Sequence, residues 1–193
     1  MRLSCCFLVV LASGCAPDLR TDHPFDGEQS TGELVSTEDL GGGVTKLVVS
    51  ATSKTAKVYV DLDELREMKT DEAFESNGWD LSLKRFEIFM NGGSSNPMGV
   101  VRAAVLKDQD FDSLTQAPAD GYLQDGAETV FNSAEGGWYF YDLGVHRLIT
   151  RDDLMYVVQT SSGAYKKLKM LNYYDEAGTP GMVSMKVAEV AAP

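Results

Sequence analysis

Cysteine is nearly absent from this chain of 193 residues. The only cysteines are Cys5, Cys6 and Cys15, so the sequence beyond them contains no thiol. That absence excludes a disulfide framework, a cysteine nucleophile and a cysteine-ligated zinc site from most of the chain. Any binding or catalytic chemistry there must come from other side chains.

Histidine is scarce as well, because His23 and His146 are the only two. A hydrolase triad needs a base beside an activated nucleophile, and histidine is the usual base. The sequence contains no GxSxG, HExxH, GxGxxG or GxxxxGK[ST] motif. Carboxylate pairs such as Asp152 and Asp153 are more typical of solvated loops than of catalytic sites. We therefore expect no enzymatic activity.

Positive charge is in deficit. Lys and Arg number 17 against 29 Asp and Glu, which gives a net charge of −12. A nucleic-acid backbone or an anionic lipid surface would be repelled by such a protein, so we exclude both as partners. The hydrophobic content of 44% and the length are those of one soluble domain with a substantial core.

Long hydrophobic runs are missing except near the N-terminus. The run Cys5–Leu11 (CCFLVVL) follows Met1-Arg2 and is too short to span a bilayer. Small residues then lead to Cys15, which is typical of a bacterial lipoprotein signal. We predict a signal peptide over 1–14, cleavage before Cys15 and lipidation of that cysteine as the membrane anchor. An ordinary secretory signal followed by a chance cysteine is the alternative.

A polar segment follows the predicted anchor. Residues 16–32 (APDLRTDHPFDGEQSTG) are rich in Pro, Gly and Asp and show no hydrophobic periodicity. Together with the lipidated cysteine, this stretch (15–32) is interpreted as a flexible tether. His23 lies within it and is given no role. The folded domain is expected over residues 33–193.

From residue 33 onward, short β-prone runs alternate with glycine-rich turns. The period of apolar residues is two in most of these runs, which favours strands. The expected strands are Val44–Ala51, Ala56–Leu62, Trp79–Met90, Gly99–Leu106, Trp138–Leu143, Met155–Thr160, Tyr165–Tyr173 and Met182–Val190. The sequence thus predicts an all-β fold, a mostly antiparallel two-layer sandwich or curled sheet.

Two segments need a more specific interpretation. Within Trp79–Met90 the apolar phase changes at Lys84-Arg85, which predicts a β-bulge or bend in a single strand. Asp61–Ala73 has apolar residues at three-residue spacing, so at most one short helix is expected there. That segment begins with DLDE, which matches a calcium-binding loop only loosely because the glycine and distal glutamate are missing.

Several fragments, taken in order, resemble the HmuY family of haem-binding bacterial lipoproteins. They cover roughly residues 44–190 and are Trp79-Asp80, KRFEI at 84–88, Asn91-Gly92-Gly93, APADGY at 117–122, Gly136-Gly137-Trp138, YVVQT at 156–160, Ser162-Gly163, YKKLKM at 165–170, Tyr173-Tyr174-Asp175 and Gly178. The resemblance implies an all-β lipoprotein without enzymatic activity. It also implies a location at the bacterial outer membrane or cell surface, and haem delivered to an outer-membrane transporter.

The same resemblance implies that haem is held between two axial side chains, histidines or methionines. One family histidine would fall within 123–135 (LQDGAETVFNSAE), which contains none. The second follows the tryptophan, and here His146 is the nearby candidate; a partly buried, hydrogen-bonded structural histidine is the alternative. Met98 and Met155 are the accessible-looking candidates for the opposite position. If the ligands have been lost, the same fold would bind a protein, a glycan or another hydrophobic ligand.

Overall fold

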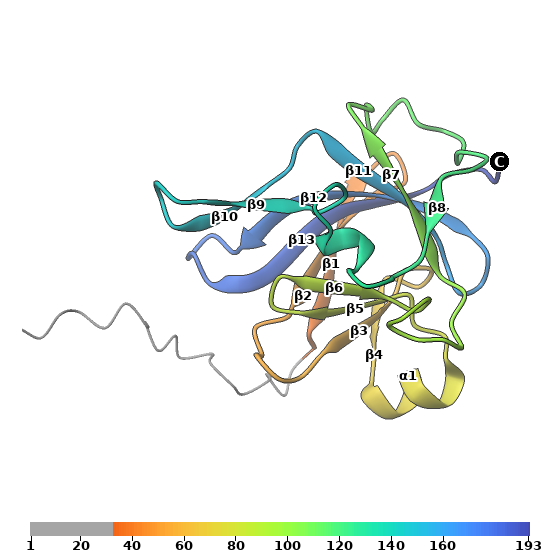
Figure 1. Cartoon of the computed structure of the whole chain (residues 1–193), viewed down its shortest axis with the longest axis horizontal. Coiled ribbons are helices and arrows are strands. Elements are labelled where there is room, and N and C mark those ends of the chain that lie inside the picture. The colour runs from red at the N-terminus through yellow and green to blue at the C-terminus, as the bar shows by residue number, and fades with distance from the viewer. Residues whose placement is uncertain (1–32) are drawn as a thin grey trace, which may run out of the picture.

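The structure, a computed structural model, describes residues 33–193. The predicted signal peptide (1–14), Cys15, the tether (15–32) and His23 lie outside the described residues. Antiparallel strands dominate the fold, which has a seven-stranded sheet, a four-stranded sheet and a separate two-stranded hairpin (Figure 1). The predicted all-β class is therefore confirmed. No helix in the described part of the chain is both long enough and apolar enough to cross a membrane.

The larger sheet has the strand order β1-β2-β13-β12-β11-β7-β8, with antiparallel pairing throughout. Its strands are β1 (Val35–Gly41), β2 (Val44–Ser50), β7 (Arg102–Lys107), β8 (Tyr122–Leu123), β11 (Leu154–Gln159), β12 (Tyr165–Tyr174) and β13 (Pro180–Glu189). The two longest strands, β12 and β13, form a hairpin at its centre. This hairpin gives the sheet a continuous apolar inner surface.

The smaller sheet has the order β4-β3-β5-β6 and packs against the larger one. Its strands are β3 (Val58–Asp61), β4 (Arg66–Met68), β5 (Leu81–Lys84) and β6 (Glu87–Met90), and the helix α1 (Thr70–Ser76) connects β4 to β5. The remaining elements are the 3-10 turn η1 (Val130–Asn132) and the hairpin of β9 (Tyr139–Asp142) and β10 (Arg147–Thr150).

The core lies between the two sheets. Alternate residues of β2 and β3 point into it, and Leu47, Val49, Val58 and Val60 are all fully or almost fully buried. Trp138, which lies just before β9, is a buried member of the same core cluster. Burial of this contiguous apolar surface is the main stabilising term, at roughly 25 cal/mol per Å² removed from water.

The segment Trp79–Met90 is a hairpin rather than one bulged strand. β5 and β6 pair with each other, with Lys84 opposite Glu87, and Arg85 in the turn has a φ of 57°. A two-residue hairpin turn requires such left-handed backbone. The chain reverses at Arg85-Phe86, and because of the change in apolar phase Ile88 and Met90 of β6 face the same core as Leu81 and Leu83 of β5.

The short helix begins later than the sequence predicts. Residues 61–68 form the end of β3, a turn and β4, and only Thr70–Ser76 is helical. The cause is the Asp61 carboxylate, which accepts the backbone N–H groups of Asp63 (2.8 Å) and Glu64 (3.0 Å). Such local side-chain hydrogen bonds stabilise a turn in competition with a helix.

Candidate functional site

His146 lies in the turn of the β9–β10 hairpin, where its φ is 53°. The turn is held by the Asp142 carboxylate, which accepts the N–H of Gly144 at 2.7 Å and that of Val145 at 3.3 Å. The imidazole is exposed, so the alternative of a partly buried histidine is wrong. Its Nδ1 lies 3.2 Å from the Tyr141 hydroxyl, whereas Nε2 has no partner among residues 33–193.

The hairpin is attached to the body of the protein along one side only. Tyr139 and Leu148 pack against the main core, and the backbone N–H of Leu148 donates to the Tyr174 hydroxyl at 3.1 Å. The Arg147 guanidinium lies 4.0 Å from the centre of the Tyr174 ring. These contacts hold the base of the hairpin, while its turn extends away from both sheets (Figure 1).

Several large apolar side chains of the same hairpin are exposed. Phe140 and Tyr141 are each 50% exposed, Leu143 reaches 76%, and Val145 is also exposed. Of these, Tyr141 is the one in contact with His146. Exposed apolar side chains on a projecting element are typical of an interaction site.

The structure does not bring the two methionine candidates to His146. Met98 is 81% exposed, but it lies at the other end of the molecule, where its carbonyl oxygen accepts a hydrogen bond from the Asn77 side chain at the end of α1 (Figure 1). Met155 is only 1% exposed. The expectation that Met155 is accessible is therefore wrong.

Met155 is buried because the large sheet is covered on its outer face at β11. The segment after β7 packs Phe111 against Met155 and Ala188. The Lys167 ammonium fixes that segment by donating to the carbonyl oxygens of Phe111 (2.6 Å) and Leu114 (2.9 Å). The sequence of β11 gave no sign that the segment containing Phe111 covers the outer face of this strand, and so it could not show that Met155 is buried.

Residues 123–135, where the resemblance would place a histidine, perform a structural task. The buried Asp125 carboxylate accepts the backbone N–H groups of Met90 (2.8 Å) and Val130 (3.0 Å) and the Ser95 hydroxyl (2.7 Å). The Asn132 side chain accepts the N–H of Ile88 at 2.9 Å. This segment therefore joins η1 to β6, a role that sequence reasoning missed.

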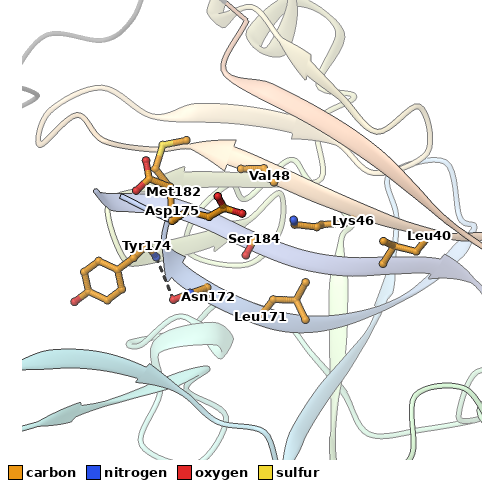
Figure 2. Close-up of a pocket in the computed structure, with 10 residues that line it drawn as sticks. Leu40, Lys46, Val48, Leu171, Asn172, Tyr174, Asp175, Met182 and Ser184 are labelled. Carbon is orange, nitrogen blue, oxygen red and sulfur yellow. Dashed lines mark hydrogen bonds between the residues drawn. The ribbon is translucent and has the colours of Figure 1, made fainter. Parts of the chain in front are cut away.

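A shallow hollow of about 530 Å³ lies on the outer face of the large sheet (Figure 2). Leu40, Val48, Leu171 and Met182 give it an apolar lining, with Lys46 among them. Figure 2 shows these side chains spread over neighbouring strands rather than converging on a point. The hollow supplies apolar surface but no matched set of iron ligands.

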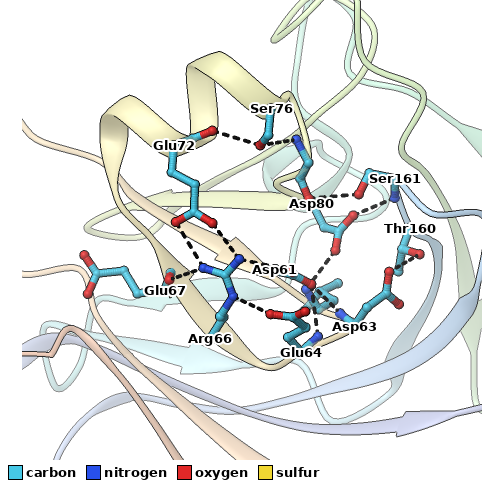
Figure 3. A network of polar contacts seen from close by, with 12 residues as sticks. Asp61, Asp63, Glu64, Arg66, Glu67, Glu72, Ser76, Asp80, Thr160 and Ser161 are labelled. Atoms are coloured by element: carbon cyan, nitrogen blue, oxygen red, sulfur yellow. Dashed lines mark hydrogen bonds and ion pairs between the residues drawn. The ribbon is translucent and has the colours of Figure 1, made fainter.

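Three carboxylates meet near the turn that follows β3 (Figure 3). Asp61, Asp63 and Asp80 have oxygen atoms within 4.8 Å of one another. Asp80 is fully buried and accepts the N–H groups of Leu62 (2.7 Å) and Ser161 (2.6 Å), and burial raises its pKa to about 6. These carboxylates bind backbone and side-chain donors of the protein, so they join the β3–β4 turn to the β11–β12 turn.

The family comparison agrees with the fragments quoted above. The sequence model of the family described as HmuY protein matches residues 53–186. No match was found among curated proteins.

Solved structures show the same fold at low sequence identity. A candidate lipoprotein from Bacteroides fragilis is 16% identical, with a TM-score of 0.58 over 86% of this chain and 100% of its own. A candidate HmuY-like heme-binding protein from Bacteroides vulgatus is 15% identical, with a TM-score of 0.55 over 81% and 97%. The apo HmuY analogue of Tannerella forsythia is 16% identical, with a TM-score of 0.56 over 82% and 97%.

Proposed function

The chain belongs to the HmuY family, and we propose that it is a non-catalytic, surface-anchored lipoprotein that binds haem for uptake through His146. One observation carries the proposal. The His146 imidazole is exposed at the turn of the β9–β10 hairpin, with Nδ1 next to the Tyr141 hydroxyl and Nε2 unpartnered within residues 33–193. The B. vulgatus neighbour is described as a heme-binding protein, which supports the same ligand.

The chemistry of the imidazole fits this role. In the tautomer whose Nδ1–H donates to the Tyr141 oxygen, Nε2 carries the free lone pair. Nε2 would then be the iron ligand, and the exposed turn residues Leu143 and Val145 would offer apolar surface to the porphyrin. Haem bound there would supply an iron with an open coordination position and a large planar apolar surface.

The hairpin offers one candidate iron ligand, His146. Met98 is at the other end of the molecule (Figure 1), so it would not hold the same haem as His146. Met155 could reach haem only if the segment containing Phe111 moved away. We therefore propose that neither methionine completes the site within one chain, and that the second position is taken from outside the chain.

A haemin titration tests the proposal. The mature protein should give a saturable change in the Soret band near one haemin per chain. His146→Ala should weaken binding roughly tenfold or more, because an iron–nitrogen bond is lost. His23→Ala is the matched control, since it removes the other histidine of the chain. A spectrum equal to that of free haemin, or equal losses in the two variants, contradicts the proposal.

The alternative is a family member that has lost the iron ligands and binds a protein, a glycan or another hydrophobic ligand. The observation that favours it is the exposure of Phe140, Leu143 and Val145 on the hairpin, which does not depend on iron chemistry. Under this alternative, His146→Ala would change nothing. A pull-down from envelope extract would recover a partner, an outer-membrane transporter included, that haemin does not displace.

We also propose that lipidation of Cys15 anchors the protein at the bacterial outer membrane or cell surface. Acyl chains contribute roughly 0.8 kcal/mol per buried methylene. Cys15→Ala should therefore move the protein from the membrane fraction to the soluble fraction.

A further inference from the structure

A second cavity, of about 500 Å³, lies at the end of the molecule opposite the β9–β10 hairpin. It opens between α1, the start of β3 and the segment 91–99 that follows β6. Tyr59 and Trp79 are nearly buried and form its base, whereas Phe74 and Met98 are 68% and 81% exposed and stand at its rim. Ligand pockets for small molecules commonly have volumes of about 300 to 1,000 Å³.

The base and rim form a connected aromatic surface. The Tyr59 ring meets the rings of Phe74 and Trp79 edge-on, with centroid distances of 5.6 Å and 5.2 Å. On the other side, Met98 adds a flexible apolar side chain that adapts to the shape of a bound group. Exposed apolar surface in a concave site favours a ligand with an apolar body.

Three hydrogen-bond donors at the same cavity have no acceptor within residues 33–193. They are the Lys57 ammonium, the Tyr59 hydroxyl and the Trp79 indole N–H. The Lys57 nitrogen lies 3.7 Å from the centre of the Phe89 ring and forms no direct ion pair within residues 33–193, although the Glu87 and Asp125 carboxylates are near enough to act on its pKa. Burial lowers the pKa of Lys57 and raises that of Tyr59, which is consistent with a partly dry environment.

Asparagines hold the wall of the cavity in place. The Asn96 side chain donates to the side-chain oxygens of Asn77 and Asn91, both at 2.6 Å, and Asn77 donates to the Met98 carbonyl at 3.2 Å. Gly99 allows a close approach, since a Cβ there would lie 2.1 Å from the Asn91 carbonyl oxygen. The backbone of segment 91–99 is thus fixed before a ligand arrives, while the Met98 side chain stays adaptable, and a preformed wall lowers the entropic cost of binding.

We propose that this cavity binds a small carboxylate with an aromatic or aliphatic body. The carboxylate would accept charge-assisted hydrogen bonds from Lys57 and neutral ones from Tyr59 and Trp79. Its body would lie between Phe74 and Met98. A neutral apolar ligand would leave the three donors unpaired, which is unfavourable. The site is separate from the hairpin and does not depend on haem.

The test compares 1-naphthylacetate with its neutral amide, 1-naphthylacetamide, by ¹H–¹⁵N NMR. The chain has two tryptophans, and only Trp79 lines the cavity. The indole N–H of Trp138 donates to the Phe86 carbonyl at 3.0 Å inside the fold and serves as an internal reference. The carboxylate should shift the Trp79 indole signal saturably and leave the Trp138 signal in place. The amide should bind roughly tenfold more weakly.

Variants separate the two parts of the site. Lys57→Met keeps the side-chain stem and should abolish the preference for the carboxylate over the amide. Phe74→Ala should weaken both probes, because it removes the apolar wall. Lys107→Met, at an exposed lysine of β7, and Leu123→Ala, at an exposed leucine of β8, are the matched controls and should leave both affinities unchanged. A Trp79 signal that does not move with millimolar carboxylate, or equal affinities of the wild-type protein for the two probes, overturns the proposal.

Discussion

The two ends of the molecule differ in how their candidate sites are held. At the hairpin end, formed by β9, β10 and their turn, the His146 imidazole has one hydrogen-bond partner within residues 33–193, and that partner, Tyr141, is exposed as well. At the cavity end, formed by α1, the start of β3 and segment 91–99, side-chain amides and close backbone contacts connect the wall to the sheet. The projecting hairpin is thus held by fewer contacts than the cavity end, which agrees with our proposals of a large flat ligand at the first and a small one at the second.

The family signature follows the same division. Its most specific part, from Trp79-Asp80 to Asn91-Gly92-Gly93, builds the cavity end. There the Asn91 side chain donates to the Trp79 carbonyl at 2.7 Å, and Asp80 accepts two backbone N–H groups. The signature therefore encodes the rigid frame of the fold. The residues that would bind iron lie outside it, which explains why a chain can match the family and still differ at the ligand positions.

The largest expected difference between the two ends is in how much stability is lost when one glycine at each end is replaced by alanine. Gly93 has a φ of 64°, and a Cβ there would lie 2.0 Å from the Asp125 carbonyl oxygen. Gly93→Ala should lower the free energy of unfolding by at least about 3 kcal/mol. At Gly144, in the hairpin turn, a Cβ would meet only the Asp142 carboxylate at 3.1 Å, so Gly144→Ala should cost less than about 1 kcal/mol.

Urea unfolding followed by tryptophan fluorescence measures both values. Both indoles lie in the body of the protein rather than in the hairpin, so the signal reports the whole fold in each variant. Comparable losses of stability in the two variants would show that the ends are equally constrained and would remove the basis of the comparison.

A pH dependence is the next effect in size, and it belongs to the cavity side of the fold. Burial raises the pKa of Asp80 to about 6, from an ordinary value of about 3.9 in an unfolded chain. A raised carboxyl pKa means that folding favours the protonated form. Protonated Asp80 therefore adds to the free energy of unfolding. This stabilisation, up to about 3 kcal/mol, is fully present below about pH 4 and is lost as the pH rises to about 6.

Asp80→Asn isolates this contribution. The variant removes the titrating group and lowers stability at every pH, because an amide oxygen cannot fully replace two carboxylate acceptors. The free energy of unfolding of the wild type minus that of Asp80→Asn should therefore be larger at pH 4 than at pH 7. Asp142→Asn, at the hairpin turn, is the control. A difference for Asp80→Asn that is constant with pH contradicts a raised pKa in the folded state.

Hydrophobic patterns in the sequence correctly predicted the strands that pack at least one face against the core. β2, β11, β12 and β13 follow the expected ranges closely, because their β-branched and apolar residues alternate or run continuously into the core. β1 was missed since all but its first residue are exposed, so VSTEDLG has no apolar period to detect. Its position is set by a hairpin with β2, whose turn falls at Gly42-Gly43. That glycine run signals a turn, but the exposed strand before it has no apolar alternation to mark it.

The candidate site was predictable only in part. The family resemblance, which expects a histidine after the tryptophan, together with the scarcity of histidine singled out His146. The sequence did not identify Tyr141 as its hydrogen-bond partner. The sequence could not show that Met98 and His146 occupy opposite ends, because their separation depends on how the two sheets pack. Nor could it show the donors of the second cavity, since Lys57 and Trp79 approach one another only after β3 and the segment before β5 are placed together.

The smallest predicted effect concerns how firmly the hairpin is attached. Tyr174→Phe removes the hydroxyl that accepts the Leu148 N–H but keeps the ring beneath the Arg147 guanidinium. Global stability should fall by about 1 kcal/mol or less, the usual net value of one hydrogen bond. Hydrogen exchange at the Leu148 amide should accelerate severalfold, while the amides of β11 keep their protection as an internal reference. If the Leu148 amide exchanges at the wild-type rate, the core contacts of Tyr139 and Leu148 hold the hairpin by themselves, and the hairpin end is more rigid than its hydrogen bonds indicate.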